Sequence, residues 1–244
     1  MAWYFQTSPH DMHDYDSAQT PVLVDAPFNG KTRKLVLTAA RNGYFFVLDR
    51  VTGEHLLTTK YAMDTNWADG LNKFGGPQHN PEKNATVGGS LVSPNSSGTI
   101  NWEPPAFSPE TGFLYVPENN TYAIYYLTDL DPRGSMGLGG REEVDVGSGG
   151  SFLTAIDYKT GKAAWRHRYY GRGGGGGGVL ATAGGLVFAG DGAGSLVAHD
   201  ATTGKPVWNT RIGEVTNAPQ TYELDGHQYI IAATGDMLWS FMLY

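Results

Sequence analysis

Residues 155–165 read AIDYKTGKAAW, and residues 198–208 repeat the pattern as AHDATTGKPVW. The shared frame is Ala-x-Asp-x3-Gly-x3-Trp, and its two copies start 43 residues apart. A self-similar unit with a period in this range is typical of propellers and solenoids. A weaker third copy, VLDRVTGEHLL at residues 47–57, has Leu in the position of the Trp.

Each copy has the chemistry of a β-hairpin. Apolar residues alternate up to the Asp, a Gly that tolerates positive φ follows in the turn, and alternation resumes through the Trp. The chain has 34 Gly, 13 Pro and 30 aromatic residues, and no window of helical length shows an apolar stripe. We therefore predict an all-β fold, a β-propeller built of four-stranded antiparallel blades.

The two ends of the sequence predict incomplete blades. Residues 1–6, MAWYFQ, resemble the strand after such a turn, with Trp3 in the Trp position but without the Asp and Gly before it. Near the other end, residues 220–224 and 228–233 flank an Asp225-Gly226 turn, and residues 237–242 form a third strand. We expect one partial propeller domain over residues 1–244, a truncated part of a longer propeller with about four blades, whose open edges are surfaces for association.

Composition excludes several classes of function. The formal net charge of −7 leaves no basic surface of the kind that nucleic-acid binding requires. The chain has no Cys, which rules out disulfides and thiolate metal sites. No apolar run reaches membrane-spanning length, and the first residues lack the basic and apolar pattern of a signal peptide.

Two stretches fall outside the blade pattern and are predicted to be long loops, residues 62–100 and residues 129–150. Long loops on a rigid scaffold are usually functional or mobile. A third stretch, Arg172 followed by six glycines, superficially resembles a phosphate-binding loop. It lacks the Lys-Ser/Thr of that motif and no helix is predicted after it, so a connection between blades is the better interpretation.

Polar chemistry concentrates in residues 9–16, PHDMHDYD, directly after the first predicted strand. Segments that leave the strands of a propeller form its faces, where ligands bind. In an extended stretch Asp14 and Asp16 point to the same side, so both could offer hard oxygen ligands to one cation. The alternative is a solvated polar loop with Asx turns.

Three separated motifs carry a family resemblance. They are WYFQTSPHD at residues 3–11 with Asp14 after it, RNGY at residues 41–44, and Asn101-Trp102-x-Pro104. With this spacing the chain resembles the C-terminal half of the pyrroloquinoline quinone (PQQ)-dependent alcohol dehydrogenases. These quinoproteins are eight-bladed propellers whose repeats carry the frame described above. The resemblance implies a periplasmic enzyme that oxidises primary alcohols to aldehydes by hydride transfer to a metal-bound quinone.

The resemblance also implies roles for single residues. Asp14 matches the family's catalytic aspartate, the base that takes the hydroxyl proton of the alcohol, and a nearby metal ion would assist it. Arg41 matches the catalytic cation that hydrogen-bonds the quinone oxygens. Asn101 and Trp102 match residues that contact the cofactor. Without the resemblance, Asp14 could be an Asx-turn residue and Arg41 a solvated turn residue. Asn101 could likewise be a turn amide and Trp102 a core indole.

Asp16 bears on the identity of the metal. An Asp two residues after the catalytic Asp resembles the lanthanide-dependent members of the family, whereas the calcium-dependent methanol dehydrogenases have a small residue there. An extra carboxylate suits a trivalent ion, because highly charged hard cations favour additional anionic oxygens. Asp14 and Asp16 are the predicted metal ligands. Three alternatives stay open: they bind a lanthanide, they bind calcium, or they bind neither metal.

Departures from the family pattern limit the expected activity. The family's Cys pair, its floor Trp, and the Glu and Asn of the metal site belong to the N-terminal half and are not in these 244 residues. Gly176 stands where methanol dehydrogenases have a Trp. No haem-attachment motif is present, so electrons would leave to a separate acceptor such as a cytochrome c. We expect little or no activity from the isolated chain. A non-catalytic propeller that serves as an interaction or assembly scaffold is the second hypothesis.

Overall fold

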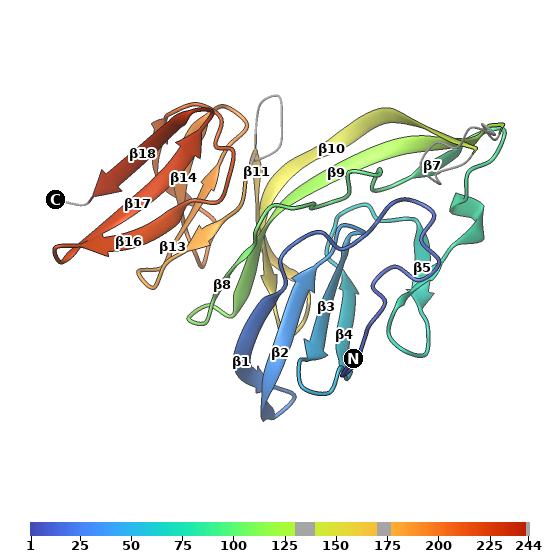
Figure 1. The fold of residues 1–244 in the computed structure, drawn as a ribbon, viewed down its shortest axis with the longest axis horizontal. Helices are drawn as coiled ribbons and strands as arrows, with labels where there is room; N and C mark the ends of the chain where they lie inside the picture. The colour runs from blue at the N-terminus through green and yellow to red at the C-terminus, as the bar shows by residue number, and fades with distance from the viewer. Residues whose placement is uncertain (130–139, 170–176, 243–244) are drawn as a thin grey trace.

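The computed structural model describes residues 1–129, 140–169 and 177–242. The described part is an all-β fold that contains a single short 3-10 helix. Its strands form four antiparallel sheets that follow one another along the chain, together with a separate two-stranded hairpin. Figure 1 shows these sheets side by side, from the first sheet in blue to the fourth in red. The prediction of antiparallel propeller blades is confirmed.

The first sheet is a complete blade with the strand order β1-β2-β3-β4. Asn29 and Gly30 both have positive φ in the turn between its first two strands, the conformation that a tight hairpin favours. The third strand ends at the Asp of the weak repeat copy, and that Asp accepts hydrogen bonds from the next backbone amides. The strands are β1 (Val22–Phe28), β2 (Lys31–Ala39), β3 (Tyr44–Asp49) and β4 (His55–Lys60).

The second sheet contains the two longest strands, β9 (Phe113–Leu127) and β10 (Arg141–Asp157). Its order is β11-β10-β9-β7, and β8 pairs with the other end of β9. The prediction of a loop over residues 129–150 is wrong, because β10 already begins at Arg141 and pairs with β9 from there. Figure 1 shows this hairpin reaching beyond the other blades. The remaining strands are β7 (Ser90–Val92), β8 (Ala106–Ser108) and β11 (Ala163–Tyr169).

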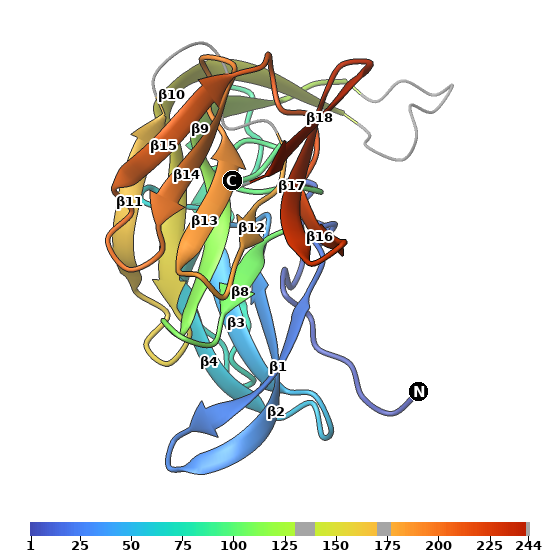
Figure 2. The same ribbon diagram turned by 90° about the vertical axis from the view of Figure 1, so that its left-hand side faces the viewer.

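The third sheet is again a complete blade, in the order β12-β13-β14-β15. The fourth has the order β16-β17-β18, and its first turn is the predicted Asp225-Gly226 with positive φ at both residues. Figure 2 shows these two sheets next to each other. Their strands are β12 (Leu180–Ala181), β13 (Leu186–Gly190), β14 (Ser195–Asp200), β15 (Pro206–Arg211), β16 (Gln220–Leu224), β17 (His227–Thr234) and β18 (Met237–Met242).

The stretch predicted as a loop, residues 62–100, is mostly irregular, but the prediction is wrong at β7, which pairs with β9 in the second sheet. It holds the hairpin of β5 (Ala68–Leu71) and β6 (Pro77–His79), and then the 3-10 helix η1 (Pro81–Lys83). Trp67 lies before β5, is completely buried, and donates from Nε1 to the carbonyl oxygen of Asn42 at 2.7 Å. The segment is therefore fixed to the end of the first blade.

The repeat frame has a direct structural meaning at the blade junctions. Trp165 on β11 packs on Gly204 in the turn of the next blade, and its Nε1 donates to the carbonyl of Ala201 at 3.0 Å. A Cβ at Gly204 would overlap the Trp165 ring, which explains why this turn requires Gly. The Trp of one copy and the Gly of the next thus form one contact, and the repeat encodes the stacking of blades.

Trp3 makes the same contact with the first blade. Its ring packs on Gly53, and its Nε1 donates to the carbonyl of Arg50 at 3.1 Å. Met1–Gln6 is nevertheless not a strand, contrary to the prediction, because no neighbouring strand among the described residues pairs with it. Trp208 on β15 is 41% exposed and meets the edge of Phe241 on β18 with ring centroids 5.6 Å apart.

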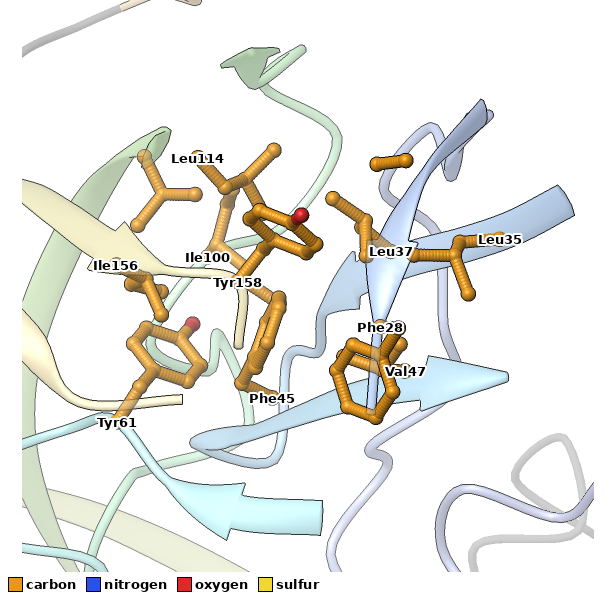
Figure 3. Packing of buried hydrophobic residues seen from close by; sticks show 13 residues of the cluster. Phe28, Leu35, Leu37, Phe45, Val47, Tyr61, Ile100, Leu114, Ile156 and Tyr158 are labelled. Atoms are coloured by element: carbon orange, nitrogen blue, oxygen red, sulfur yellow. The ribbon is translucent and has the colours of Figure 1, made fainter. Parts of the chain in front are cut away.

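The main apolar core lies between the first and second sheets. Figure 3 shows Phe45 from β3 close to Tyr158, which follows β10, and Ile156 near the end of β10 belongs to the same buried cluster. Leu37 and Val47 from the first sheet and Leu114 from the second belong to the same buried cluster. Full burial of such a side chain contributes about 1.5–3 kcal/mol, so this junction is a major source of stability. It also fixes the position of β2, which ends two residues before Arg41.

Candidate active site at the end of the first blade

Residues 9–16 form a tight loop that Asp11 organises. The two oxygens of its carboxylate accept hydrogen bonds from the backbone amides of His13 at 2.8 Å and Tyr15 at 2.6 Å. These are Asx-turn contacts, so the alternative interpretation of this stretch holds for Asp11. His10 and Asp14 have positive φ, which Asp adopts more readily than most residues. The loop therefore presents Asp14 at a bend.

Alternate side chains anchor this loop in the protein. Tyr15 is completely buried, and its hydroxyl donates to the carbonyl of Pro94 at 2.5 Å. His13 is also buried and lies 2.9 Å from the carbonyl of Lys83 through Nε2, which is the protonated nitrogen in that contact. Burial lowers the pKa of His13, which favours its neutral form. With both anchors pointing inward, Asp14 and Asp16 face solvent.

Arg41 lies against the two exposed carboxylates. Its NH1 is 2.5 Å from Asp16 Oδ1, and its NH2 is 3.3 Å from Asp14 Oδ2. The Arg41 side chain is only 11% exposed, whereas those of Asp14 and Asp16 are 49% and 69% exposed. One guanidinium thus joins residues 25 and 27 positions away in sequence. The structure therefore brings Asp14 and Arg41 together, with Asp16 beside them.

The residues after Arg41 explain its position. The Asn42 side chain donates to the carbonyl of Thr7 at 2.9 Å and to the Ser8 hydroxyl at 3.0 Å, so the N-terminal loop is attached to the end of β2. Its Oδ1 accepts from the amide of Tyr44 at 2.9 Å, which closes the turn before β3. The Arg-Asn-Gly-Tyr motif therefore holds the loop with Asp14 and Asp16 beside the guanidinium.

Residues 95–101 enclose the other side of Arg41. Ser96 accepts at its carbonyl from Arg41 Nε at 2.9 Å, and the amide of Thr99 donates to the Arg41 carbonyl at 2.9 Å. Gly98 has φ of +81°, and a Cβ there would overlap both the side chain and the carbonyl of Arg41. The guanidinium is therefore held from two directions before any ligand binds.

The long β9–β10 hairpin supports this enclosure. Glu143 Oε1 accepts from the amide of Ser96 at 2.8 Å, and Asp145 Oδ1 accepts from the Asn95 side chain at 2.7 Å. Arg141 donates to the carbonyl of Met12 in the N-terminal loop. These contacts cannot be predicted from the sequence, because nothing in it connects residues 141–145 with a loop about 130 positions earlier. Only the length of the two strands brings them together.

Asn101 and Trp102 lie on the same enclosing segment but make other contacts. The Asn101 side chain donates to the carbonyl of Ser97 at 3.1 Å, and its amide donates to Glu103 Oε2 at 2.9 Å. Trp102 is 53% exposed, which is not the environment of a core indole. Among the described contacts Asn101 is linked to the loop that holds Arg41 and not to Arg41 itself.

The donor set fits one side of a cation site. Asp14 and Asp16 converge on one guanidinium, so their carboxylates face the same region, and Asp16 accepts from Arg41 and not from amides of its own loop. Within the described ranges no group of three or more His, Asp or Glu side chains could hold a metal ion. Two carboxylates would therefore need additional ligands from outside this group. Residues 173–176 of the glycine-rich stretch, which include Gly176, lie outside the described residues.

Comparison with known proteins agrees with this arrangement. A family profile described as glucose/ethanol/alcohol dehydrogenase, beta-propeller domain, matches residues 1–63, which include Asp14, Asp16 and Arg41. The quinoprotein alcohol dehydrogenase PedH of Pseudomonas putida is 35% identical over 96% of the chain. The chain is a relative of the quinoprotein alcohol dehydrogenases. The quinohemoprotein alcohol dehydrogenase of Comamonas testosteroni is also 35% identical over 96% of the chain.

Solved structures of quinoproteins have the same fold. The crystal structure of the Comamonas testosteroni enzyme matches 96% of the chain with a TM-score of 0.86 and 33% identity, and the chain covers 36% of it. A europium-containing methanol dehydrogenase matches 95% with a TM-score of 0.84 and 30% identity, and the chain covers 42% of it. The chain spans 41% of the length of PedH and 34% of the curated Comamonas enzyme.

A second family profile matches another part of the chain. It is described as outer membrane protein assembly factor BamB and covers residues 149–241, the region of the two clear repeat copies. The first profile thus covers Asp14, Asp16 and Arg41, the second covers the two clear repeat copies, and neither covers residues 64–148. No helix in the described ranges is long and apolar enough to cross a membrane.

Proposed function

We propose that this chain is the C-terminal part of a PQQ-dependent alcohol dehydrogenase that oxidises primary alcohols to aldehydes, and that it contributes the catalytic base, the quinone-binding Arg and part of the metal site. The observation that carries the proposal is the contact of Arg41 with both Asp14 and Asp16, three residues that the sequence motifs had singled out. The similarity to quinoprotein alcohol dehydrogenases supports the reaction class. The 244 residues would then form one partial propeller domain of that enzyme.

Asp14 is the proposed base. Its carboxylate is half exposed at the bend of the loop, so an alcohol can approach it from solvent. A carboxylate is a weak base in water, and it becomes effective only when it is positioned against the proton that it accepts. The Asx turn at Asp11 and the buried anchors on either side provide that positioning. An amide at position 14 would keep the shape but could not accept the proton.

Arg41 is the proposed cation for the two adjacent carbonyl oxygens of the quinone. PQQ, when bound, supplies the carbon that accepts hydride from the alcohol. Arg41 would stabilise charge on oxygen in that reaction, because a guanidinium that is already oriented needs no reorganisation. Its contacts with Ser96 and Thr99 fix its direction. Asn101 and Trp102 are proposed to contact the cofactor from the neighbouring loop.

Asp14 and Asp16 are proposed to bind the metal ion that polarises the cofactor and substrate. Both are hard oxygen donors, which Ca²⁺ and trivalent lanthanides prefer, and the second carboxylate favours the more highly charged ion. A lanthanide is the first candidate and calcium the second. Further ligands would come from residues outside the group described above.

The enzyme would need partners beyond this chain. A small primary alcohol is the proposed substrate, and a cytochrome c or a similar external acceptor is the proposed electron partner. Relatives whose names include cytochrome c, such as a 1-butanol dehydrogenase of Thauera butanivorans, support this choice. The periplasm is the proposed compartment. We expect the 244 residues by themselves to have little or no turnover.

Binding of PQQ tests the proposal without requiring turnover. In an isothermal calorimetric titration, PQQ should bind to the chain in the presence of La³⁺ or Ca²⁺. The variant Arg41→Ala should raise the dissociation constant for PQQ at least tenfold. Arg33→Ala is the matched control, because that Arg pairs with Asp49 and Glu54 on the surface of the first blade. Equal affinities for the wild type and Arg41→Ala would contradict the assignment of Arg41.

Measurements of alcohol oxidation distinguish the roles of the Asp14 and Asp16 carboxylates, in an enzyme preparation that is active toward alcohols. Asp14→Asn should abolish dye-linked oxidation with either metal. Asp16→Ala should abolish oxidation supported by La³⁺ and leave the activity with Ca²⁺ largely intact, because the trivalent ion loses a charge-balancing ligand. Full La³⁺-dependent turnover by Asp16→Ala would refute the metal role of that residue.

A propeller scaffold without catalysis is the second candidate, supported by the BamB profile over residues 149–241. A scaffold has no need for a guanidinium fixed against two carboxylates. Under this alternative the chain would bind neither PQQ nor La³⁺ measurably, and Asp14→Asn would leave its function unchanged. The calorimetric titration therefore distinguishes the two candidates.

A further inference from the structure

The start of β10 contacts the loop of residues 9–16, which carries Asp14. Arg141, the first residue of β10, donates to the carbonyl of Met12 in that loop. Its guanidinium carbon lies 4.9 Å from the ring centroid of Tyr125 on β9. Tyr125 meets the ring of His13 nearly at a right angle, with ring centroids 5.1 Å apart, and both of these rings are buried. The β9–β10 hairpin therefore holds the loop from its polar and its apolar side.

The same strand contacts the segment that encloses Arg41. Glu143 lies two residues after Arg141 and so faces the same side of the strand, and its Oε1 accepts from the amide of Ser96 at 2.8 Å. Asp145 Oδ1 accepts from the side chain of Asn95 at 2.7 Å. Two carboxylates of β10 thus fix two consecutive residues of the enclosing segment.

Ser96 in turn determines the direction of the Arg41 side chain. Arg41 donates from NH1 to Asp16 and from NH2 to Asp14, both in the loop of residues 9–16. Its third side-chain hydrogen bond to a described residue runs from Nε to the carbonyl of Ser96 at 2.9 Å. This third bond is the one that connects the guanidinium to the second sheet, by way of Ser96 and Glu143.

We propose that Glu143 is a positioning residue for Arg41, and that the start of β10 sets the distance between Arg41 and Asp14 because it contacts both of their segments. The inference rests on the proposed function, in which Asp14 is the base and Arg41 binds the quinone oxygens. A guanidinium that is fixed before the ligand arrives loses less freedom on binding and needs no reorganisation during the reaction. A carboxylate suits this task, because a hydrogen bond to a charged acceptor is stronger than one to a neutral acceptor.

The neighbouring Glu142 offers a matched control. Its side chain points to the opposite side of β10, and the residue is exposed. Glu143→Ala and Glu142→Ala therefore remove the same group from adjacent positions of one strand, but only the first leaves the amide of Ser96 without its acceptor. Glu143→Gln is the conservative variant, because its amide oxygen can still accept from Ser96.

The mobility of Arg41 tests the contact without any ligand. In ¹⁵N relaxation measurements, the Nε–H group of Arg41 should have an order parameter above about 0.8 in the wild type and in Glu142→Ala. Glu143→Ala should lower it below about 0.6, and Glu143→Gln should recover most of the loss. An unchanged order parameter in Glu143→Ala, or an equal loss in Glu142→Ala, would overturn the proposal.

The affinity for PQQ tests whether Glu143 acts through Arg41. In calorimetric titrations with La³⁺, Glu143→Ala should raise the dissociation constant for PQQ roughly tenfold, whereas Glu142→Ala should change it less than about twofold. In the Arg41→Ala background, Glu143→Ala should have no additional effect, because the side chain that it positions is gone. Additive losses in the double variant would show a general effect on the fold and would overturn the proposal. Absence of PQQ binding by the wild type would contradict the proposed function, and the order parameter of Arg41 would then decide the role of Glu143 by itself.

Discussion

Replacement of Glu118 by Gln should be among the most destabilising single changes in this protein. The carboxylate is completely buried, yet it accepts hydrogen bonds from the Thr154 hydroxyl at 2.6 Å, Arg166 Nε at 2.9 Å and the Asn120 side chain at 2.9 Å. It also accepts from the amide of Met63 at 3.3 Å, which links the first blade to the second. All four partners donate, two to each carboxylate oxygen, so both oxygens of Glu118 must act as acceptors.

The structure gives the size of the effect. A Gln keeps one acceptor oxygen but turns an NH2 group toward donors, which leaves at least one of them without a partner, since of the four only the Met63 amide has a second acceptor close by, Asn120 Oδ1 at 3.1 Å. A buried donor without an acceptor costs about 1–3 kcal/mol, and removal of one member of a buried ion pair costs about 3–5 kcal/mol. The Arg166 side chain is 28% exposed and can turn to water, which favours the lower end. We expect a loss of about 3 kcal/mol in the free energy of unfolding.

Urea unfolding followed by tryptophan fluorescence measures this loss. With a denaturant dependence of about 3 kcal/mol per molar urea for a chain of this size, the midpoint should fall by roughly 1 M. Glu54→Gln is the control, since Glu54 pairs with Arg33 at 2.7 Å on the surface and is worth at most about 1 kcal/mol. A midpoint shift for Glu118→Gln no larger than that of the control would refute the argument that this acceptor is required.

Three further predictions concern other parts of the structure. Burial lowers the pKa of His199 from its ordinary value of 6.5 to about 4 in the folded protein. The contribution of neutral His199 to stability is therefore complete above pH 6.5 and is lost as the pH falls toward 4. Urea midpoints measured across this pH range should fall by the equivalent of up to about 3 kcal/mol, and they should fall less in His199→Gln. Gly98→Ala should weaken PQQ binding by the chain and lower its melting temperature, because the new Cβ displaces Arg41. Trp165→Ala should cost about 3 kcal/mol in urea unfolding, the lower end of the range for core tryptophans because Trp165 is partly buried, and Trp208→Ala less than half as much, because Trp208 is 41% exposed. Equal losses for the two tryptophans would show that the junction contact does not depend on burial.

The repeat and its turns could be predicted because their causes are local. Alternation of apolar residues, an Asp that accepts from the next amides, and a Gly with positive φ occur within eleven residues of each other. The hairpin at Asp225-Gly226 was found for the same reason. The loop predicted over residues 129–150 failed because residues 141–150, with their glycines and charges, are poor strand formers taken alone. Pairing with the whole length of β9 overrides that preference.

Sequence alone determined the architecture of blades and singled out Asp14, Asp16 and Arg41, which contact one another in the structure. Tertiary structure decided how they converge: Asp11 shapes the loop, Asn42 attaches it to β2, and residues 95–101 enclose Arg41. It also decided that Trp3 docks like Trp165 although its segment has no strand partner. Hydrogen bonds of the loops between residues tens of positions apart form only once the blades have stacked, and no local pattern encodes those loop contacts. Periodicity and turn chemistry are properties of short segments, and for that reason they are visible in the sequence.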